Sequence, residues 1–243
     1  MTYFSTYSLS RSFGGVRAVN DATVEIEQGK ISALIGPNGS GKTTFFNLVT
    51  GMITADAGKV LFKGSSIGGL KPHQVALRGV GRTFQITRLF REMTVLENML
   101  VPVRRFGVRE LLKDAVGGSE AARAMLWLDR VGLTKLQGEP AANLSYGQQK
   151  LLELASLMMS EPELVLLDEP AGGVNPVMIQ RISGLVRELN SEGTTFFIVE
   201  HNMPLVMDLC DHVVVFDAGI PIAKGTPDVI RDDPKVIEAY LGG

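Results

Sequence analysis

A run of nine residues has the types and spacing that binding of a phosphate chain requires. In order they are Gly36, Pro37, Asn38, Gly39, Ser40, Gly41, Lys42, Thr43 and Thr44, which satisfies the pattern G-x-x-x-x-G-K-[ST]. The glycines let the backbone curl so that its N–H groups point at phosphate oxygens without Cβ clashes. Lys42 would reach the β- and γ-phosphates, Thr43 would place its hydroxyl on Mg²⁺, and Thr44 would add a donor. The run predicts a nucleoside triphosphate site; the alternative is a glycine-rich turn that binds nothing.

Adjacent acids follow an apolar run and could complete such a site. The run Leu164–Leu167 leads into Asp168 and Glu169. Asp168 could hold Mg²⁺ through its water shell, and Glu169 could orient and polarise a water that attacks the γ-phosphate. Adjacent acids at the end of a strand are also common as plain surface residues. The glycine-rich loop in the same chain favours the catalytic interpretation.

The segment Asn143–Lys150 has the features of a helix start. Ser145 stands where an N-cap would be, and apolar residues continue at helical spacing from Leu151 to Met158. Taken alone, this segment could be an ordinary capped amphipathic helix.

The elements around these residues would place the glycine loop at the end of a strand. Ile31–Ile35 is an apolar run that ends at the first glycine, and Lys42–Thr50 has the spacing of a short helix. Ala22–Glu27 alternates as a half-buried strand does. Thr195–Val199 and Val213–Phe216, like the run before the acids, are typical of buried parallel strands. The sequence predicts an α/β fold.

A helical region interrupts this pattern from roughly residue 87 to residue 140. Its expected helices are Val95–Val101, Val108–Val116 and Ser119–Val131, separated by Pro102, Gly107 and the pair Gly117-Gly118. Helices are also expected near Pro176–Asn190 and Pro204–Cys210. We predict one domain over residues 1–243, with a core from 1–86 and 161–243 and an inserted helical lobe over roughly 87–160.

The composition narrows the classes of function. The 24 basic and 26 acidic residues give a net charge of −2, which lends no support to nucleic-acid binding. Cys210 is the single cysteine, so an intrachain disulfide framework is excluded and a reducing cytoplasm fits. The N-terminal residues lack the pattern of a secretory signal, and the apolar runs are far shorter than the roughly 18 residues of a spanning helix. If the protein works at a membrane, we expect another chain to span it.

Together these motifs resemble those of ABC ATPases, from Tyr7 to Leu241. Asn143–Lys150 is similar to the family's signature motif, with Tyr146 where the commonest form has glycine. The resemblance implies an α/β P-loop ABC ATPase fold with an N-terminal antiparallel β subdomain, a mainly parallel core sheet with flanking helices, and the inserted helical lobe. It also implies hydrolysis of ATP with Mg²⁺.

The resemblance implies roles for residues that the spacing alone does not single out. Gln85 looks like the glutamine that senses Mg²⁺ and the γ-phosphate, and it would serve with Thr43 and Asp168 at the metal. His201 looks like the switch histidine at the γ-phosphate. Phe13 resembles the aromatic that stacks on adenine, although a simple strand aromatic is the alternative.

The resemblance further implies that each ATP site is built by two subunits. Ser145, Gly147 and Gln148 would face the γ-phosphate of ATP held by the opposite chain, at the N-terminus of their helix. Asn175 replaces the aspartate that the family usually has in the loop after the acids. ATP binding would close two head-to-tail subunits and hydrolysis would reopen them.

Within the family, the strongest resemblance is to the larger ATP-binding subunit of branched-chain amino acid importers. It rests on the segments Leu144–Gly147, Glu169–Pro176, Glu200–Met207, Gly225–Pro227 and Glu238–Leu241. The implied partners are integral-membrane permeases, a second ABC ATPase subunit of the same or a paralogous chain, and indirectly an extracytoplasmic solute-binding protein. The implied location is the cytoplasmic side of the plasma (inner) membrane, peripheral through the permeases.

Three alternatives stay open on the sequence. The ATPase of lipopolysaccharide export is similar and also tolerates tyrosine in the signature motif. ABC ATPases of DNA repair or translation control are non-transport machines, but the long coiled-coil insertion of the former and the paired domains of the latter are both missing here. A regulatory protein that binds ATP without hydrolysing it is disfavoured because Glu169 and His201 are both in place.

Overall fold

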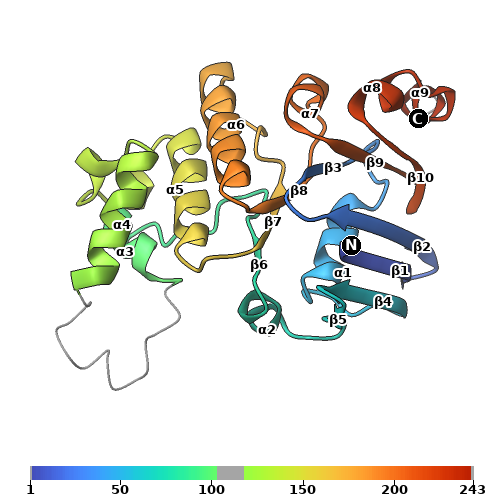
Figure 1. Ribbon diagram of the computed structural model, residues 1–243, viewed down its shortest axis with the longest axis horizontal. Coiled ribbons are helices and arrows are strands. Elements are labelled where there is room, and N and C mark those ends of the chain that lie inside the picture. Colours follow the sequence, from blue (N-terminus) through green and yellow to red (C-terminus); the bar gives the residue numbers. More distant parts are fainter. Residues whose placement is uncertain (1, 103–117, 242–243) are drawn as a thin grey trace.

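The computed structural model describes residues 2–102 and 118–241 (Figure 1). The strands are β1 (Thr2–Phe13), β2 (Val16–Glu27), β3 (Ile31–Ile35), β4 (Ala57–Phe62), β5 (Ser65–Ser66), β6 (Val80–Arg82), β7 (Leu164–Asp168), β8 (Thr195–Val199), β9 (His212–Asp217) and β10 (Ile220–Gly225). The α-helices are α1 (Lys42–Val49), α2 (Pro72–Leu77), α3 (Val95–Leu100), α4 (Gly118–Arg130), α5 (Tyr146–Met158), α6 (Pro176–Ser191), α7 (Met203–Leu209), α8 (Pro227–Arg231) and α9 (Pro234–Leu241), with short 3₁₀ turns η1 (Thr134–Leu136) and η2 (Ala141–Asn143). The predicted helix Val108–Val116 lies outside the described residues.

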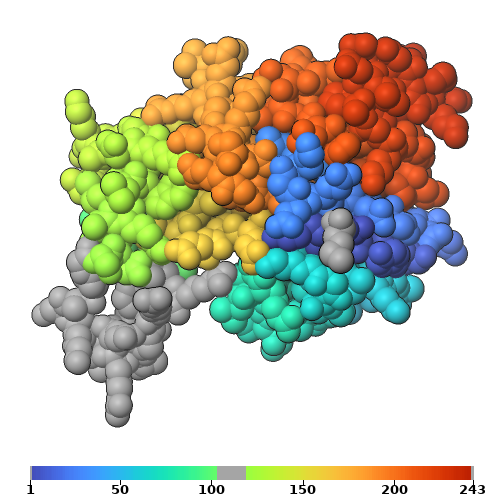
Figure 2. All heavy atoms as spheres, viewed as in Figure 1, coloured from blue at the N-terminus to red at the C-terminus, as the bar shows by residue number. Residues whose placement is uncertain are grey.

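The molecule is elongated, with two sheets toward one end and helices α3 to α6 toward the other (Figures 1 and 2). The smaller sheet is antiparallel, with strand order β2-β1-β4-β5. Its longest pair is the β1–β2 hairpin, which runs from Thr2 opposite Glu27 to Phe13 opposite Val16. Within the described ranges, no helix combines the length and apolar character that crossing a bilayer needs.

The larger sheet has the strand order β10-β9-β3-β8-β7-β6. All neighbouring pairs from β9 to β6 are parallel, and β10 pairs antiparallel with β9. The carboxyl ends of β3, β8, β7 and β6 therefore share one edge of the sheet. This edge carries the segments that begin at Gly36, Glu200, Glu169 and Thr83. Ligands of open α/β sheets bind outside such an edge.

The predicted α/β fold, with its antiparallel and mainly parallel sheets, is confirmed. The expected strands Ile31–Ile35 and Thr195–Val199 match β3 and β8 residue for residue, since both are fully buried apolar runs. The expected strand Ala22–Glu27 is the second half of β2, where buried and exposed residues alternate. The first half of β2 lacks a regular alternation of buried and exposed residues.

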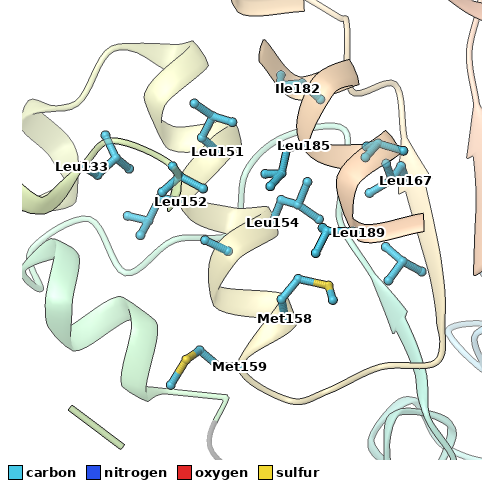
Figure 3. Packing of buried hydrophobic residues seen from close by; sticks show 14 of the residues in the cluster. Leu133, Leu151, Leu152, Leu154, Met158, Met159, Leu167, Ile182, Leu185 and Leu189 are labelled. Atoms are coloured by element: carbon cyan, nitrogen blue, oxygen red, sulfur yellow. The ribbon is translucent and has the colours of Figure 1, made fainter. Parts of the chain in front are cut away.

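Helices α3 to α6 pack on one another and on the sheet through a continuous apolar cluster. Figure 3 shows Leu154 of α5 pointing toward Leu185 and Leu189 of α6, while Leu152 points to the other side, toward Leu133. Each buried leucine contributes roughly 2 kcal/mol of transfer free energy. Helix α5 therefore packs between α6 on one side and α3 and α4 on the other.

A second apolar cluster fixes α1 between the two sheets. Phe45 of α1 lies edge-on to Phe216 of β9, with ring centroids 5.2 Å apart. Phe46 packs against Phe197 of β8 at the same centroid distance of 5.2 Å. All these rings are fully buried. Because both faces of α1 are held, the start of the helix has a fixed position next to the end of β3.

Candidate functional site

The glycine-rich loop follows β3 directly and leads into α1. Gly36 and Gly41 have φ angles of 148° and 96°, which residues with side chains rarely adopt. A Cβ at Gly36 would lie 2.1 Å from the carbonyl oxygen of Phe216, and a Cβ at Gly41 would lie 2.2 Å from that of Ala18. Both positions require glycine, because the loop passes directly against neighbouring backbone. At Gly39 only the φ angle of 81° favours glycine, since the space around it is open.

Lys42, the first residue of α1, turns back over this loop. Its ammonium donates to the carbonyl oxygens of Gly36 and Pro37, both at 2.9 Å. Burial lowers the pKa of Lys42, and the negative charges of Glu169 and then of Asp168 oppose that shift. The loop's buried cation therefore lies within electrostatic reach of the two acids at the end of β7.

Asp168 ends β7 in a buried ion pair with Arg82 of β6. The Arg82 Nη2 atom lies 2.8 Å from Asp168 Oδ2, and the two side chains are 7% and 3% exposed. Arg82 also donates to Asn47 Oδ1 at 2.8 Å and to Thr50 Oγ1 at 2.9 Å. These bonds give both Nη atoms of a desolvated guanidinium a partner, while its buried Nε has none, and they tie two strands to α1. The ion pair engages one of the two Asp168 carboxylate oxygens.

Glu169 brings Gln85 and His201 together at the edge of the sheet. Gln85 Nε2 donates to Glu169 Oε2 at 2.8 Å, and His201 Nδ1 lies 3.9 Å from Glu169 Oε1. The backbone of Glu169 is left-handed, with φ of 49°, and its N–H donates to the carbonyl of Val199 at 2.9 Å. Such backbone strain in a non-glycine residue costs on the order of 1 kcal/mol or more and often marks functional positions.

Ser145 caps α5 as the sequence predicts. Its hydroxyl accepts from the N–H of Gln148 at 3.4 Å, and the Gln148 side chain accepts from the N–H of Ser145 at 2.9 Å. This reciprocal pair is a capping box. Gly147 lies in the first turn against α6, where a Cβ would approach Met178 Cγ to 2.5 Å. The exposed Ser145 hydroxyl thus stands at the free N-terminus of a well-anchored helix.

Asn175 has a local role that accounts for its place in the loop after the acids. It is the N-cap of α6, and its Oδ1 accepts from the N–H of Met178 at 2.9 Å. Asparagine and aspartate are about equally good N-caps, so the replacement of the family's usual aspartate preserves this cap.

The sequence that carries this loop, capped helix and acids is similar to known proteins. A family model described as "ABC transporter" matches residues 19–172, which is more than half of the chain. The chain belongs to the ABC transporter family. A second model, described as "Branched-chain amino acid ATP-binding cassette transporter", matches residues 221–243.

Curated members of this family match almost the whole chain. The high-affinity branched-chain amino acid transport ATP-binding protein of Pseudomonas aeruginosa is 43% identical, covering 96% of this chain and 95% of that one. The protein of the same description from Escherichia coli strain K12 is 44% identical, covering 98% and 97%.

Solved structures of ABC transporter cassettes have the same fold. A nucleotide-free ATP-binding cassette superposes with a TM-score of 0.90 at 33% identity, and both chains are covered completely. A cassette in its ADP conformation superposes with a TM-score of 0.89 at 34% identity, again with both chains covered completely.

The residues of this ABC cassette fit a magnesium ion held partly by phosphates and water. Mg²⁺ prefers oxygen donors and is usually bound by one or two carboxylates plus substrate phosphates. Asp168 offers one carboxylate held in place by Arg82, Thr43 offers a hydroxyl at the exposed start of α1, and Gln85 an amide oxygen. The donor set therefore suits the predicted ion.

Phe13 lies apart from the cluster around Glu169, at the end of β1. The residue is 45% exposed, and the Arg11 guanidinium lies over its ring, with the Cζ atom 4.9 Å from the ring centroid. This cation–π contact occupies one face of the ring. Stacking of adenine on Phe13 stays a prediction of the family resemblance.

Sequence reasoning missed buried polar residues that hold this site. One is Arg82, described above, and another is Lys150 of α5. A third is Glu200, which is 1% exposed and accepts from the N–H groups of Ala171, His201 and Asn202 at 2.7, 2.9 and 3.0 Å. The available signal was a charged residue close to a candidate site residue, since Glu200 precedes His201 directly and Arg82 lies three positions before Gln85. The partners of such residues are set by the tertiary fold.

Glu153 of α5 gives this site a pH-dependent contribution to stability. Burial raises the pKa of Glu153 from 4.5 to about 7, against hydrogen bonds from the Arg88 and Phe84 N–H groups and the charge of Lys150. The folded state thus binds the proton more tightly, so this contribution is fully present below about pH 4.5 and is lost as pH rises through about 7. We expect the free energy of unfolding of Glu153→Gln minus that of the wild type to rise by up to about 3 kcal/mol over this window.

Urea unfolding of both proteins across this pH range measures the effect. An equal slope of stability against pH in the two proteins would show that Glu153 does not titrate there. Glu25→Gln, at an exposed position of β2, is the matched control and should follow the wild type.

Proposed function

We propose that this chain binds and hydrolyses MgATP to drive a membrane importer of branched-chain amino acids. The observation that carries the hydrolytic part is the meeting of Gln85, Glu169 and His201 at the strand edge that also presents the glycine loop. The solute is supported by the relatives, which are described as branched-chain amino acid transport proteins, and by the matching C-terminal model.

In this proposal the loop and α1 bind the phosphates. The loop's N–H groups and the N-terminus of α1 surround the phosphate chain, and the Lys42 ammonium exchanges its carbonyl partners for β- and γ-phosphate oxygens. Thr43, Asp168 and Gln85 would hold Mg²⁺, which supplies charge neutralisation at the phosphates. These groups stabilise the negative charge that develops as the bond between the β- and γ-phosphates breaks.

Glu169 acts on the attacking water in this proposal. Its carboxylate orients the water and accepts its proton, while His201 contacts the γ-phosphate. Gln85 now bonds to the same carboxylate, so its amide is placed to report whether ligand is present. Gln85, the proposed sensor, and His201, the proposed phosphate contact, thus both lie beside the carboxylate that is the proposed base.

A second subunit completes each site in this proposal. The N-terminus of α5 in one chain, with Ser145, Gly147 and Gln148, would face the γ-phosphate held by the other chain. ATP would thus join two subunits head to tail, and hydrolysis would release them. The natural pair is two copies of this chain or this chain with a paralogous ATPase.

The segment after Gln85 is the proposed contact with a permease at the cytoplasmic face of the membrane. Ile86 is 78% exposed and Phe90 is 54% exposed, which makes this an apolar surface next to the sensor. We assign the helical lobe to residues 87–160, so that motion at Gln85 passes to the lobe and the permease together. An extracytoplasmic binding protein would deliver the solute to the other side.

Uptake by reconstituted vesicles tests the proposed solute. Proteoliposomes that contain this chain, its copurifying permeases and the binding protein should accumulate radiolabelled leucine only when ATP is inside. Glu169→Gln in the same vesicles is the matched control and should abolish uptake. Copurification with a lipopolysaccharide-export permease set, or ATP-dependent uptake of a solute other than branched-chain amino acids, would overturn the assignment of solute.

A further inference from the structure

One face of α5 holds the segment that carries Gln85. Tyr146, Lys150 and Glu153 are spaced by four and three residues, so their side chains lie on the same side of the helix. Tyr146 Oη donates to the carbonyl oxygen of Gln85 at 3.0 Å, and Lys150 Nζ donates to the same oxygen at 3.2 Å. Glu153 Oε1 accepts from the N–H groups of Phe84 and Arg88, each at 3.3 Å. This face of α5 therefore bonds to the backbone on both sides of Gln85.

Lys150 also bonds to Glu169, whose side chain meets that of Gln85; we call Gln85 and Glu169 the hydrolytic pair. Its ammonium donates to the carbonyl oxygen of Glu169 at 3.0 Å. The side chains of the same two residues meet 2.8 Å apart, from Gln85 Nε2 to Glu169 Oε2. The Lys150 ammonium thus joins the backbones of both residues of the hydrolytic pair.

The burial of Lys150 shows that this contact is specific. The residue is 7% exposed, and an ammonium out of water is costly unless acceptors surround it. The two carbonyls are those acceptors, and the Glu153 carboxylate is a nearby counter-charge. A solvent-exposed lysine would make no such demand on the positions of the two backbones.

The backbone of Glu169 needs to be held in place. Its φ angle of 49° is disfavoured for a residue with a Cβ and persists only where the surroundings fix it. Bonds on both sides of the residue do so, from its N–H to the Val199 carbonyl and from Lys150 to its carbonyl. The same carbonyl also accepts from the Gly172 N–H at 3.0 Å, so loss of the ammonium would remove one of its two bonds and let the carboxylate shift relative to Gln85.

We propose that Lys150, supported by Tyr146, is a positioning residue for ATP hydrolysis that sets the distance between the side chains of Gln85 and Glu169. This inference rests on the proposed hydrolysis. Lys150 acts through the two backbones and touches neither the glycine loop nor the phosphates. Because Ser145 caps the same helix, the geometry of the hydrolytic pair depends on the position of the helix N-terminus that would face the second subunit's nucleotide.

Steady-state ATPase kinetics of Lys150→Met test the proposal. Methionine fills a similar volume without the ammonium. We expect kcat to fall by about 10- to 100-fold, as for a misplacement of about 1 Å at a reacting pair. The KM for ATP should stay within about twofold, because the phosphate-binding residues are untouched. Lys150→Arg should recover most of the rate, and Lys135→Met, an exposed lysine in η1, should match the wild type.

Tyr146→Phe keeps the ring and removes a single hydrogen bond to Gln85, so it tests the same contact if Lys150→Met does not fold. We expect its kcat to fall by about 3- to 10-fold, the effect of one hydrogen bond. An unchanged kcat in either variant, a matching rise in KM, or no rescue by Lys150→Arg would overturn the positioning role. A wild type that does not hydrolyse ATP would instead overturn the proposed function.

Discussion

Replacing Glu169 with glutamine is expected to lower the kcat for ATP hydrolysis by about 10²- to 10⁴-fold, the usual contribution of a general base. Glutamine has nearly the same shape and keeps an oxygen that can accept from Gln85 Nε2. It lacks the negative charge that would polarise the attacking water. The phosphate-binding loop and Lys42 remain, so MgATP should still bind with an affinity close to that of the wild type. Phosphate release and equilibrium binding of MgATP, measured on the same sample, separate the two effects.

The matched control is Glu25→Gln, an acid on the exposed face of β2, which should hydrolyse ATP at the rate of the wild type. Retained turnover in Glu169→Gln would remove this residue from the role of base. Because the variant traps ATP, its mass in solution should also double with MgATP, and Ser145→Arg should reverse that doubling. A monomer that still binds ATP would mean that a different ATPase subunit or the permeases are needed for pairing.

The core of the fold was predictable because its strands carry a local signal. Ile31–Ile35 and Thr195–Val199 are buried on both faces, so each is a continuous apolar run whose ends are visible in the sequence. Strands that are not buried on both faces do not show this pattern. In β4, Ala57 to Lys59 are exposed, and β10 has no buried residue, so neither was predicted from its own pattern.

The site was predictable where the chemistry demands a fixed local order. The glycine loop needs a glycine at Gly36 and Gly41 because backbone passes within contact of their Cα atoms, and this need appears in the sequence as a motif. Gln85 and His201 were singled out only by family resemblance, and their contacts with Glu169 come from the structure. These contacts join residues 84 and 32 positions apart, and no local pattern encodes which strand ends are neighbours.

The supporting residues could not be predicted, because their signals are ambiguous. Lys150 stands near the start of an amphipathic helix, where a lysine is ordinarily solvent-exposed. Its burial follows from α5 packing beneath the Gln85 segment, which depends on the tertiary fold. Arg82 is likewise one charge at the end of a short strand until β6 is placed beside β7. Such residues support the site by bonding to backbone carbonyls and carboxylates, and no local sequence pattern shows which of these will be their partners.

Lys42→Ala is expected to weaken MgATP binding by roughly 100-fold, because hydrogen bonds to charged groups contribute about 1.5–3 kcal/mol and each 1.4 kcal/mol is a factor of ten in affinity. In the wild type, burial lowers the pKa of Lys42, but the Glu169 and Asp168 carboxylates favour its charged form. Alanine also removes the bonds to Gly36 and Pro37, so the loop loses the ammonium that fixes its carbonyls. Calorimetric titration with MgATP, in a Glu169→Gln background to prevent turnover, measures the affinity.

Lys59→Ala, on an exposed part of β4, is the matched control and should bind MgATP as the parent does. The thermal midpoint of Lys42→Ala must stay close to that of the parent for the loss to be assigned to the missing ammonium. Undiminished affinity in a folded Lys42→Ala variant would mean that the N–H groups of the loop and of α1 provide the binding, and that Lys42 orders the empty loop. A loss that spares ADP but not ATP would instead place the Lys42 contact at the γ-phosphate, which is the atom group that Glu169 and His201 must reach for hydrolysis.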